Sequence, residues 1–440
     1  MIFKKDSSSN KNRRNSSSYS FKKASSGSFR KKSDSDNYSK KSSNSFGRSS
    51  APGRFRSFNK NNKRSGGRRF HSSARIDHAK FINKAVITEE SEKFIPEHNF
   101  LDFQIDSRLK NNISEKGYSI PTPIQDKTIP YILKGVDLVG IAQTGTGKTG
   151  AFLIPLINKV LISKSEQIMI IVPTRELATQ ISDELKSFTK GLYINSVCCV
   201  GGISIGPQIN SLRNFNNFII GTPGRIKDLV NRSKIKLENF STVVLDEADR
   251  MLDMGFINDM KFIMSKMSKN RQTLFFSATL SNEVEILIKD FLNSPIRIRV
   301  ASRITSDHID QDVVKIDKNS TKFDVLVNLL KQPGFDKILI FGRTKHGVEN
   351  LSKKLNSLGF KTESIHGNKT QGKRQKALSM FKVDNVKILV ATDVAARGLD
   401  ISGVSHVINY DMPATHEDYI HRIGRTGRAG KAGKALTFID

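Results

Sequence analysis

Residues 142–149, AQTGTGKT, combine small side chains with a lysine and a threonine in an order that suits a bound phosphate chain. Gly145 and Gly147 let backbone N–H groups turn inward around phosphate oxygens, which a Cβ atom would obstruct. Lys148 is placed to reach the β- and γ-phosphates, and Thr149 to bind Mg²⁺ at the start of the following helix. The stretch therefore predicts a site for ATP or GTP.

A second stretch, STVVLDEAD at residues 241–249, ends an apolar run with acidic side chains. Asp246 would hold Mg²⁺, and Glu247 would orient or deprotonate the water that attacks the γ-phosphate. Acidic residues after a strand also serve as simple charges at a helix N-terminus. The phosphate loop earlier in the same chain favours the metal and water roles.

The segments around these residues alternate between short apolar runs and amphipathic stretches from about residue 97 onward. Runs such as IMIIVP and TLFFSAT are typical of parallel strands buried on both faces, and TRELATQISDELKSF between them is typical of a helix. This alternation predicts a doubly wound parallel-sheet α/β domain over residues 97–300. The pattern loosens near residues 296–320 and restarts, which predicts a second α/β domain over residues 310–440.

The formal net charge of the chain is +30, and much of it lies near the N-terminus. Residues 1–75 contain 21 Lys and Arg against three Asp and no Glu, a net charge of +18. Because aliphatic side chains are almost absent, residues 1–80 are predicted to form a disordered tail. Phenylalanine rings in the tail can stack on bases while the charges track phosphates, so we interpret it as an RNA tether. A purely solubilising tail and an organelle transit peptide stay open as alternatives.

Hydropathy and cysteine content indicate the compartment. No apolar run in the sequence approaches the roughly 20 residues that span a bilayer, so no membrane partner is expected. The only cysteines, the adjacent Cys198 and Cys199, suit neither a disulfide framework nor a metal site. They indicate buried thiols in a reducing compartment, and we expect a cytoplasmic location.

Three motifs carry a family resemblance: DEAD at residues 246–249, SAT at residues 277–279 and HRIGRTGRAG at residues 421–430. Their sequences and their order resemble the DEAD-box ATP-dependent RNA helicases of superfamily 2. Within that family, the overall sequence character is most similar to the bacterial RhlE-like branch. The resemblance implies two tandem RecA-like domains that close over ATP on one side and single-stranded RNA on the other. Family members usually continue past the last strand into a helix, so either the second domain is truncated at Asp440 or it has an exposed apolar flank.

The resemblance also implies nucleotide contacts beyond the phosphate loop. GYSIPTPIQ at residues 117–125 is similar to the adenine-reading motif of the family, in which Gln125 would pair with the base edge and Phe100 would stack on the ring. An amide offers one donor and one acceptor, which fits adenine and favours ATP over GTP. Arg425 and Arg428 would reach the γ-phosphate when the domains close. The implied nucleotide-binding residues are Phe100, Gln125, Gly145, Thr146, Gly147, Lys148, Thr149, Asp246 and Asp393; the implied catalytic residues are Lys148, Glu247, Arg425 and Arg428; and the implied metal ligands are Thr149 and Asp246.

PTRELA at residues 173–178 and TPGR at residues 222–225 resemble RNA-contacting motifs of the first domain. Arginine and threonine side chains are suitable phosphate donors, and glycine permits close approach of the backbone. Arg343 stands where the family often has Asn, which leaves the RNA contact at that position open. The implied RNA-binding residues are Arg175, Gly202, Thr222, Arg225, Gln371, Arg374 and Thr392. The implied residues that couple the ATP site to the RNA site are Ser277, Thr279 and His421.

These features predict an ATP-dependent RNA helicase whose cofactors are ATP and Mg²⁺. In this hypothesis RNA-stimulated ATP hydrolysis drives local, largely sequence-independent unwinding of short RNA duplexes or remodelling of ribonucleoprotein. The expected partners are single-stranded and short duplex RNA, in ribosomal or mRNA-decay ribonucleoprotein, and the protein is expected to be a monomer. An ATP-gated RNA clamp and a DNA translocase stay open as rival functions.

Overall fold

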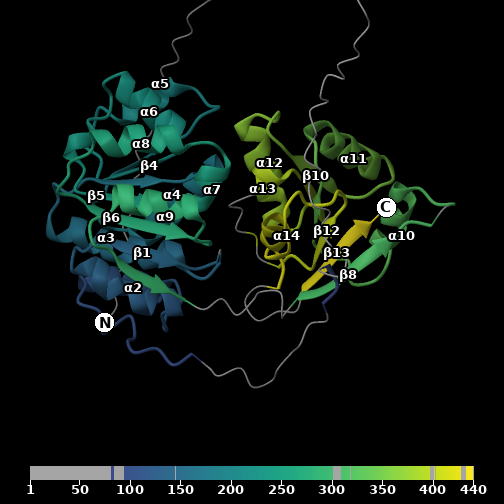
Figure 1. Cartoon of the computed structure of the whole chain (residues 1–440), viewed down its shortest axis with the longest axis horizontal. Coiled ribbons are helices and arrows are strands. Elements are labelled where there is room, and N and C mark those ends of the chain that lie inside the picture. The colour runs from purple at the N-terminus through teal and green to yellow at the C-terminus, as the bar shows by residue number, and fades with distance from the viewer. Residues whose placement is uncertain are drawn as a thin grey trace, which may run out of the picture. The chain divides into compact units, whose positions relative to one another are not determined.

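The computed structural model describes most of the chain beyond the basic tail, namely residues 81–83, 94–143, 145–300, 309–317, 319–396, 401, 403–427 and 433–439. The predicted disordered tail at residues 1–80 and the predicted catalytic Arg428 lie outside the described residues. The described part contains two parallel sheets, each with its own helices (Figure 1). The predicted fold class, two tandem RecA-like α/β domains, is confirmed.

The first sheet has seven parallel strands in the order β3-β4-β2-β5-β6-β1-β7. Helical connections return the chain to the same end of the sheet each time, which keeps the strands parallel. The strands are β1 (Leu138–Ile141), β2 (Ile168–Ile171), β3 (Ser196–Cys199), β4 (Phe218–Gly221), β5 (Thr242–Leu245), β6 (Gln272–Ser277) and β7 (Ile296–Arg299). The helices are α1 (Ser107–Glu115), α2 (Pro123–Leu133), α3 (Lys148–Ile162), α4 (Arg175–Phe188), α5 (Ile205–Ser211), α6 (Pro223–Asn231), α7 (Ala248–Asp253), α8 (Ile257–Lys266) and α9 (Asn282–Phe291), with a 3₁₀ helix, η2, over Leu237–Asn239.

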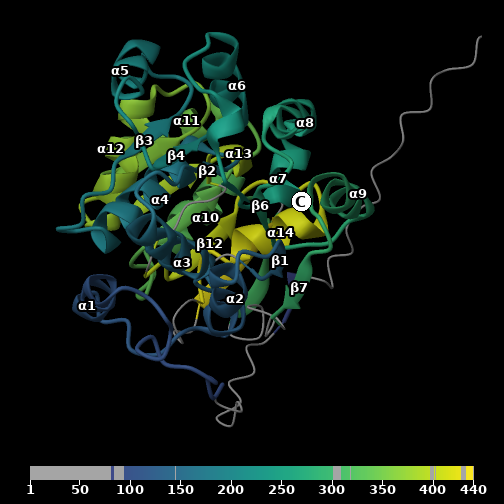
Figure 2. The same ribbon diagram turned by 90° about the vertical axis from the view of Figure 1, so that its left-hand side faces the viewer.

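Strand β2 illustrates why the central strands of the first sheet are mostly apolar, without alternation of polar and apolar residues. Ile168 and Ile170 belong to a core that helices α1 to α4 cover. Met169 and Ile171 belong to a second core on the opposite face, which helices α6 to α9 cover (Figure 2). Because successive side chains of a strand point to opposite faces, a sheet with helices on both sides needs apolar residues without alternation.

A glycine in β1 allows close packing beside the phosphate loop. Gly140 pairs with Phe276 of the neighbouring strand β6. A Cβ atom on Gly140 would lie 2.6 Å from the Phe276 ring, which is too close for any larger residue without movement of that ring. The glycine therefore lets β1 and β6 end side by side, at Ile141 and Ser277.

The second sheet has six parallel strands in the order β10-β11-β9-β12-β13-β8. Its core is again divided between two faces, with α12 and α13 on one face and α10 and α11 on the other. The strands are β8 (Ile309–Lys315), β9 (Ile338–Phe341), β10 (Thr362–Ile365), β11 (Ile388–Ala391), β12 (His406–Asn409) and β13 (Gly433–Ile439). The helices are α10 (Lys322–Leu330), α11 (Lys345–Ser357), α12 (Gln371–Lys382), α13 (Asp393–Ala396) and α14 (His416–Ile423).

The two cysteines lie on strand β3, as adjacent residues of an apolar strand. Both are free thiols, with Cys199 buried and Cys198 partly buried. Burial raises the pKa of Cys198 to about 11 and that of Cys199 to about 12. Both side chains therefore stay protonated at neutral pH and behave as small apolar residues, as the sequence predicts.

Candidate nucleotide and RNA site

The phosphate loop connects the end of β1 to the first turn of α3. Gly145 and Gly147 have φ angles of 85° and 93°, a left-handed conformation that glycine adopts without strain. Lys148 is the first residue of α3, and its buried Nζ donates a hydrogen bond of 2.9 Å to the carbonyl oxygen of Ala142. The lysine thus folds back over the loop, with its charge at the N-terminus of a 15-residue helix.

Gln125 braces the phosphate loop from helix α2. Its Nε2 donates to the carbonyl oxygen of Gly147 at 3.0 Å, and its Oε1 accepts from the backbone N–H of Thr122 at 2.9 Å. A Cβ atom on Gly147 would lie 2.7 Å from the Gln125 amide nitrogen, so the glycine also makes room for this contact. Both ends of the Gln125 amide are therefore engaged within the protein, and its pairing with adenine stays a prediction.

Phe100 lies among other aromatic side chains of the first domain. The side chain is 3% exposed and belongs to the core of the first domain. Its ring meets the rings of Phe103 and Tyr118 edge to face, at centroid distances of 6.1 and 6.0 Å. Stacking on a base would require part of this ring to be uncovered, and that role too stays a prediction.

Asp246 and Glu247 follow directly on strand β5, at the carboxyl edge of the sheet. Burial raises the pKa of Asp246 to about 6, although the charge of Lys148 opposes the shift. Glu247 is buried with a φ of 53°, a left-handed conformation that is uncommon for a residue with a side chain. Its Oε2 accepts a hydrogen bond of 3.1 Å from Nη1 of the buried Arg250. The two carboxylates are thus held at fixed places at the end of the strand.

The second aspartate of the DEAD sequence, Asp249, is a functional candidate that the sequence reasoning did not single out. Its Oδ2 accepts hydrogen bonds from the backbone N–H groups of Ala278 and Thr279, both at 3.0 Å, and from Oγ1 of Thr279 at 3.1 Å. Ser277 in turn donates to the carbonyl oxygen of Thr279 at 2.8 Å. Burial alone would raise the pKa of Asp249, but the charges of Lys148 and Arg250 lower it. One carboxylate therefore joins the acidic motif after β5 to the SAT motif at the end of β6.

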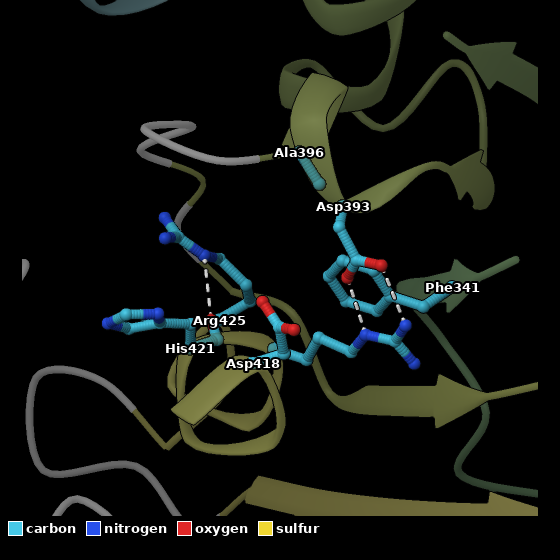
Figure 3. A pocket seen from close by; sticks show the side chains of 7 residues that line it. Phe341, Asp393, Ala396, Asp418, His421 and Arg425 are labelled. Carbon is cyan, nitrogen blue, oxygen red and sulfur yellow. Dashed lines mark hydrogen bonds and ion pairs between the residues drawn. The ribbon is translucent and has the colours of Figure 1, made fainter. Parts of the chain in front are cut away.

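Asp393 and Arg422 form a bidentate ion pair in the second domain, which dashed lines mark at Asp393 in Figure 3. Nε and Nη2 of Arg422 donate to the two oxygens of Asp393 at 2.6 and 2.8 Å. Nη1 of the same guanidinium donates to Oδ1 of Asn409 and to the carbonyl oxygen of Asp411. Arg422 is therefore a structural cation that links α14 to α13 and to the end of β12, and the ribose contact of Asp393 stays a prediction.

His421 and Arg425 line the same small pocket as the Asp393–Arg422 pair (Figure 3). Nε of Arg425 donates to the carbonyl oxygen of His421 at 3.3 Å, and only 2% of Arg425 is exposed. Burial lowers the pKa of His421 to about 4, so its imidazole is neutral at physiological pH. The last turn of α14 and the residues after it thus hold one predicted catalytic arginine close to the predicted coupling histidine.

The predicted RNA contacts of the first domain lie around one groove of about 460 Å³. Gly202 has a φ of 72°, and a Cβ atom there would meet the guanidinium of Arg175. Nη2 of Arg225 donates to the carbonyl oxygen of Ile203 at 3.1 Å, and Thr222 precedes α6 as its N-terminal cap residue. Arg175, Thr222 and Arg225 all line the groove.

Gln371 and Arg374 have a protein partner that sequence reasoning missed. Glu176, the fourth residue of PTRELA, is 1% exposed. It accepts hydrogen bonds from Nη2 of Arg374 at 2.8 Å and from Nε2 of Gln371 at 3.1 Å. RNA binding by Gln371 and Arg374 therefore stays a prediction, as does that of Thr392, which precedes α13. The one sequence signal for Glu176 was an acidic residue beside the arginine of a motif that is predicted to contact RNA.

These features define a class of protein. One strand of a parallel α/β sheet leads into a glycine-rich loop and a helix that begins with lysine, and an aspartate follows another buried strand of the same sheet. This is the nucleotide-binding arrangement of P-loop ATPases, here followed by a second domain of similar architecture.

Comparisons with known proteins identify the family. Residues 122–287 match the DEAD/DEAH box helicase family, and residues 321–430 match the helicase conserved C-terminal domain. The ATP-dependent RNA helicase CshA of Listeria monocytogenes is 48% identical over 342 residues, which cover 77% of this chain and 66% of that protein. The chain thus spans just under two thirds of the length of this relative.

Solved structures agree with this assignment. Dbp5 of S. cerevisiae, bound to RNA and ADP BeF3, is 31% identical with a TM-score of 0.69, covering 76% of this chain and 88% of that chain. The DEAD-box helicase Mss116, bound to ssRNA and UDP-BeF, is 32% identical with a TM-score of 0.71, covering 78% and 76%. The chain belongs to the DEAD-box family of ATP-dependent RNA helicases. These comparisons do not specify a branch, so the RhlE-like assignment stays a prediction.

Proposed function

We propose that this protein is an ATP-dependent RNA helicase, in which RNA-stimulated ATP hydrolysis drives local, largely sequence-independent unwinding of short duplexes or remodelling of ribonucleoprotein. The observation that carries the proposal is the contact of Asp249 with both the backbone and the hydroxyl of Thr279. This contact joins the acidic motif of the nucleotide site to the motif that the family resemblance assigns to coupling. A change at the phosphate end of the sheet would therefore be transmitted directly to the SAT segment.

The residues around the phosphate loop divide the chemistry among them. Lys148 binds the β- and γ-phosphates, and Glu247 orients or deprotonates the attacking water. Thr149 and Asp246 would hold Mg²⁺, since hydroxyl and carboxylate oxygens are the donors that this hard cation prefers. The bound ion would offset the charge of the phosphates. Arg425 and Arg428 would add positive charge at the γ-phosphate, a contribution worth roughly 10³- to 10⁵-fold in rate in related enzymes.

RNA binding would use the sugar–phosphate backbone rather than the bases. Arg175 and Arg225 supply cationic donors to the groove, and Thr222 supplies a hydroxyl. Contacts of this kind position a strand without reading its sequence. That Dbp5 and Mss116 have been solved bound to RNA supports a polynucleotide as a ligand of this protein. Gln371, Arg374 and Thr392 would add contacts from the second domain.

Duplex separation tests this proposal against an RNA clamp. A short RNA duplex with a fluorophore and a quencher on opposite strands should separate when protein and ATP are added. A non-hydrolysable ATP analogue should give at most slow separation, because repeated turnover requires phosphate release and reopening. Long ATP-dependent residence on single strands, without strand separation, would instead identify a clamp. Equal stimulation of ATP hydrolysis by single-stranded DNA would favour a translocase on DNA.

The basic tail is expected to contribute RNA affinity. Removal of residues 1–75, whose net charge is +18, should weaken RNA binding by roughly tenfold or more at moderate salt, because fewer counterions are released on binding. It should also flatten the dependence of the logarithm of affinity on the logarithm of salt concentration. Fluorescence anisotropy at several salt concentrations measures both. A tail of the same length with its Lys and Arg changed to Gln is the matched control; if deletion leaves RNA affinity unchanged, the tail is only solubilising.

We further propose a cytoplasmic monomer that acts on ribosomal or mRNA-decay ribonucleoprotein. Within the described ranges, no helix is both long enough and apolar enough to cross a bilayer. Light scattering of the purified chain, with and without RNA, measures whether one copy binds one strand.

A further inference from the structure

A short N-terminal segment, Phe81–Asn83, lies on the second domain, although the chain that follows it builds the first domain. The Phe81 side chain is completely buried. It belongs to an apolar cluster with Ile309 of β8, Ala435 of β13, and Tyr419 and Ile423 of α14. The next residue, Ile82, is 51% exposed. The segment therefore inserts one aromatic side chain into the domain and leaves its neighbour at the surface, as an anchored peptide does.

The backbone of the same segment pairs with the edge of the second sheet. Strand β8 is the last strand in the sheet, next to β13 on one side only. The N–H of Asn83 donates to the carbonyl oxygen of Gln311 at 3.1 Å, and the N–H of Gln311 donates to that of Asn83 at 2.8 Å. This antiparallel pair provides hydrogen-bond partners for backbone N–H and C=O groups that an edge strand otherwise leaves unpaired. Extended peptides commonly bind sheet edges in this way, with a side chain in a pocket for specificity.

Phe81 also contacts α14, the helix that ends just before the predicted catalytic Arg425. Its ring meets the ring of Tyr419 edge to face at a centroid distance of 4.7 Å. The Tyr419 hydroxyl donates to Oε1 of Gln311 at 2.8 Å, the residue whose backbone pairs with Asn83. Tyr419 and Ile423 are four residues apart and share one face of α14, whereas His421 lies about 200° around the helix from Tyr419. The segment thus supports α14 on a face other than the one that carries His421.

We propose that Phe81–Asn83 is a built-in ligand of the second domain, and that Phe81 is a positioning residue that holds α14 in place for ATP hydrolysis. The inference rests on the proposed function, because the action of Arg425 on the γ-phosphate is itself part of that proposal. The pair between Arg422 and Asp393 and the contact between Arg425 and the His421 carbonyl both originate at α14. A small tilt of this helix would displace the arginine side chains, and displacements of about 1 Å in an active site can cost about 10²-fold in rate.

The docking itself is testable in the full chain without nucleotide or RNA. Hydrogen–deuterium exchange of the Gln311 amide reports on the segment, because that N–H donates to Asn83. Phe81→Ala should speed this exchange by about tenfold or more, since the anchor is lost and the edge opens locally. Ile82→Ala, one residue away and exposed, is the matched control and should keep exchange within about twofold of wild type. Unchanged exchange in Phe81→Ala would overturn the docking.

A second variant leaves the apolar cluster intact. Asn83→Pro removes the N–H that donates to Gln311 but keeps Phe81, so it weakens docking without creating a cavity. Asn83→Ala keeps the N–H and is its control. Faster Gln311 exchange in Asn83→Pro, with Asn83→Ala close to wild type, supports the strand-edge contact. Equal exchange in the two variants would overturn it.

The positioning role is tested by ATPase kinetics with saturating RNA. Phe81→Ala should lower kcat by about three- to tenfold, with KM for ATP within about twofold, because the catalytic arginine is displaced while the phosphate loop is untouched. Faster amide exchange with a wild-type kcat would overturn the positioning role. If the wild-type protein shows no RNA-stimulated hydrolysis, the proposed function fails; the exchange measurement, which needs neither ligand, still decides whether the segment docks.

Discussion

Glu247→Gln is expected to lower the rate of RNA-stimulated ATP hydrolysis by roughly 10³-fold, within the range that loss of a general base produces. ATP and RNA affinity should stay within about threefold of wild type, because the change removes a charge and a proton acceptor but keeps the shape of the side chain. The predicted phenotype is a protein that binds both ligands and does not turn over.

The geometry around Glu247 explains why the effect should fall on turnover. The residue caps α7 in a left-handed backbone conformation, with φ 53°, so a strained turn fixes the direction of its side chain. Its Oε2 accepts from Arg250, which a glutamine oxygen can still do. Glutamine therefore preserves the fold of the motif while removing its capacity to accept a proton from water.

Steady-state ATPase assays together with equilibrium binding of fluorescent nucleotide and RNA measure this effect. Glu238→Gln, at an exposed position of the 3₁₀ helix η2, is the control for the same change of side chain. Wild-type hydrolysis by Glu247→Gln would remove this residue from catalysis and leave the water to be activated by another group.

Lys148→Ala is expected to weaken ATP binding by at least about 100-fold, which corresponds to roughly 2.7 kcal/mol. The buried ammonium group is the cation of the phosphate loop, and hydrogen bonds to charged groups contribute about 1.5–3 kcal/mol each. Its charge also opposes the burial that raises the pKa of Asp246, so its loss would leave that carboxyl less ready to hold a metal ion.

Isothermal titration calorimetry with Mg-ATP measures the loss of affinity. Lys159→Ala is the matched control because Lys159 lies in the same helix, where its Nζ donates to Thr242 Oγ1 at 2.8 Å. It should bind ATP as the wild type does. Unchanged nucleotide affinity in Lys148→Ala would contradict the assignment of residues 142–149 as a phosphate cradle.

The fold, and the places of the phosphate-loop and acidic residues within it, could be predicted because their signals are local. Uninterrupted apolar runs identify strands with helices on both faces, and β2 shows both faces in use. The glycines of the phosphate loop and the acids after β5 each lie within a few residues of a strand end. In a parallel sheet, the carboxyl ends of all strands lie along the same edge. Residues that directly follow different strands are therefore expected to lie close to one another in space.

The pairings between distant segments could not be predicted in this way. Glu176 accepts hydrogen bonds from Gln371 and Arg374, almost 200 residues further along the chain. No local sequence pattern shows whether these two donors bind a carboxylate of the protein or a phosphate of RNA. Phe100 matches an adenine-stacking position in sequence but is packed among aromatic residues of the core. Phe81 lies in a basic region and gave no sequence signal, because its pocket is formed by β8, β13 and α14 of the second domain.

The most direct measurement is steady-state ATP hydrolysis by the 440-residue chain, with and without single-stranded RNA and beside a DNA strand of the same sequence. If RNA binding closes the two domains and brings the second-domain arginines to the γ-phosphate, RNA should stimulate hydrolysis by at least about tenfold and DNA should not. Hydrolysis that is independent of RNA, or equally stimulated by DNA, would contradict an RNA-gated ATPase.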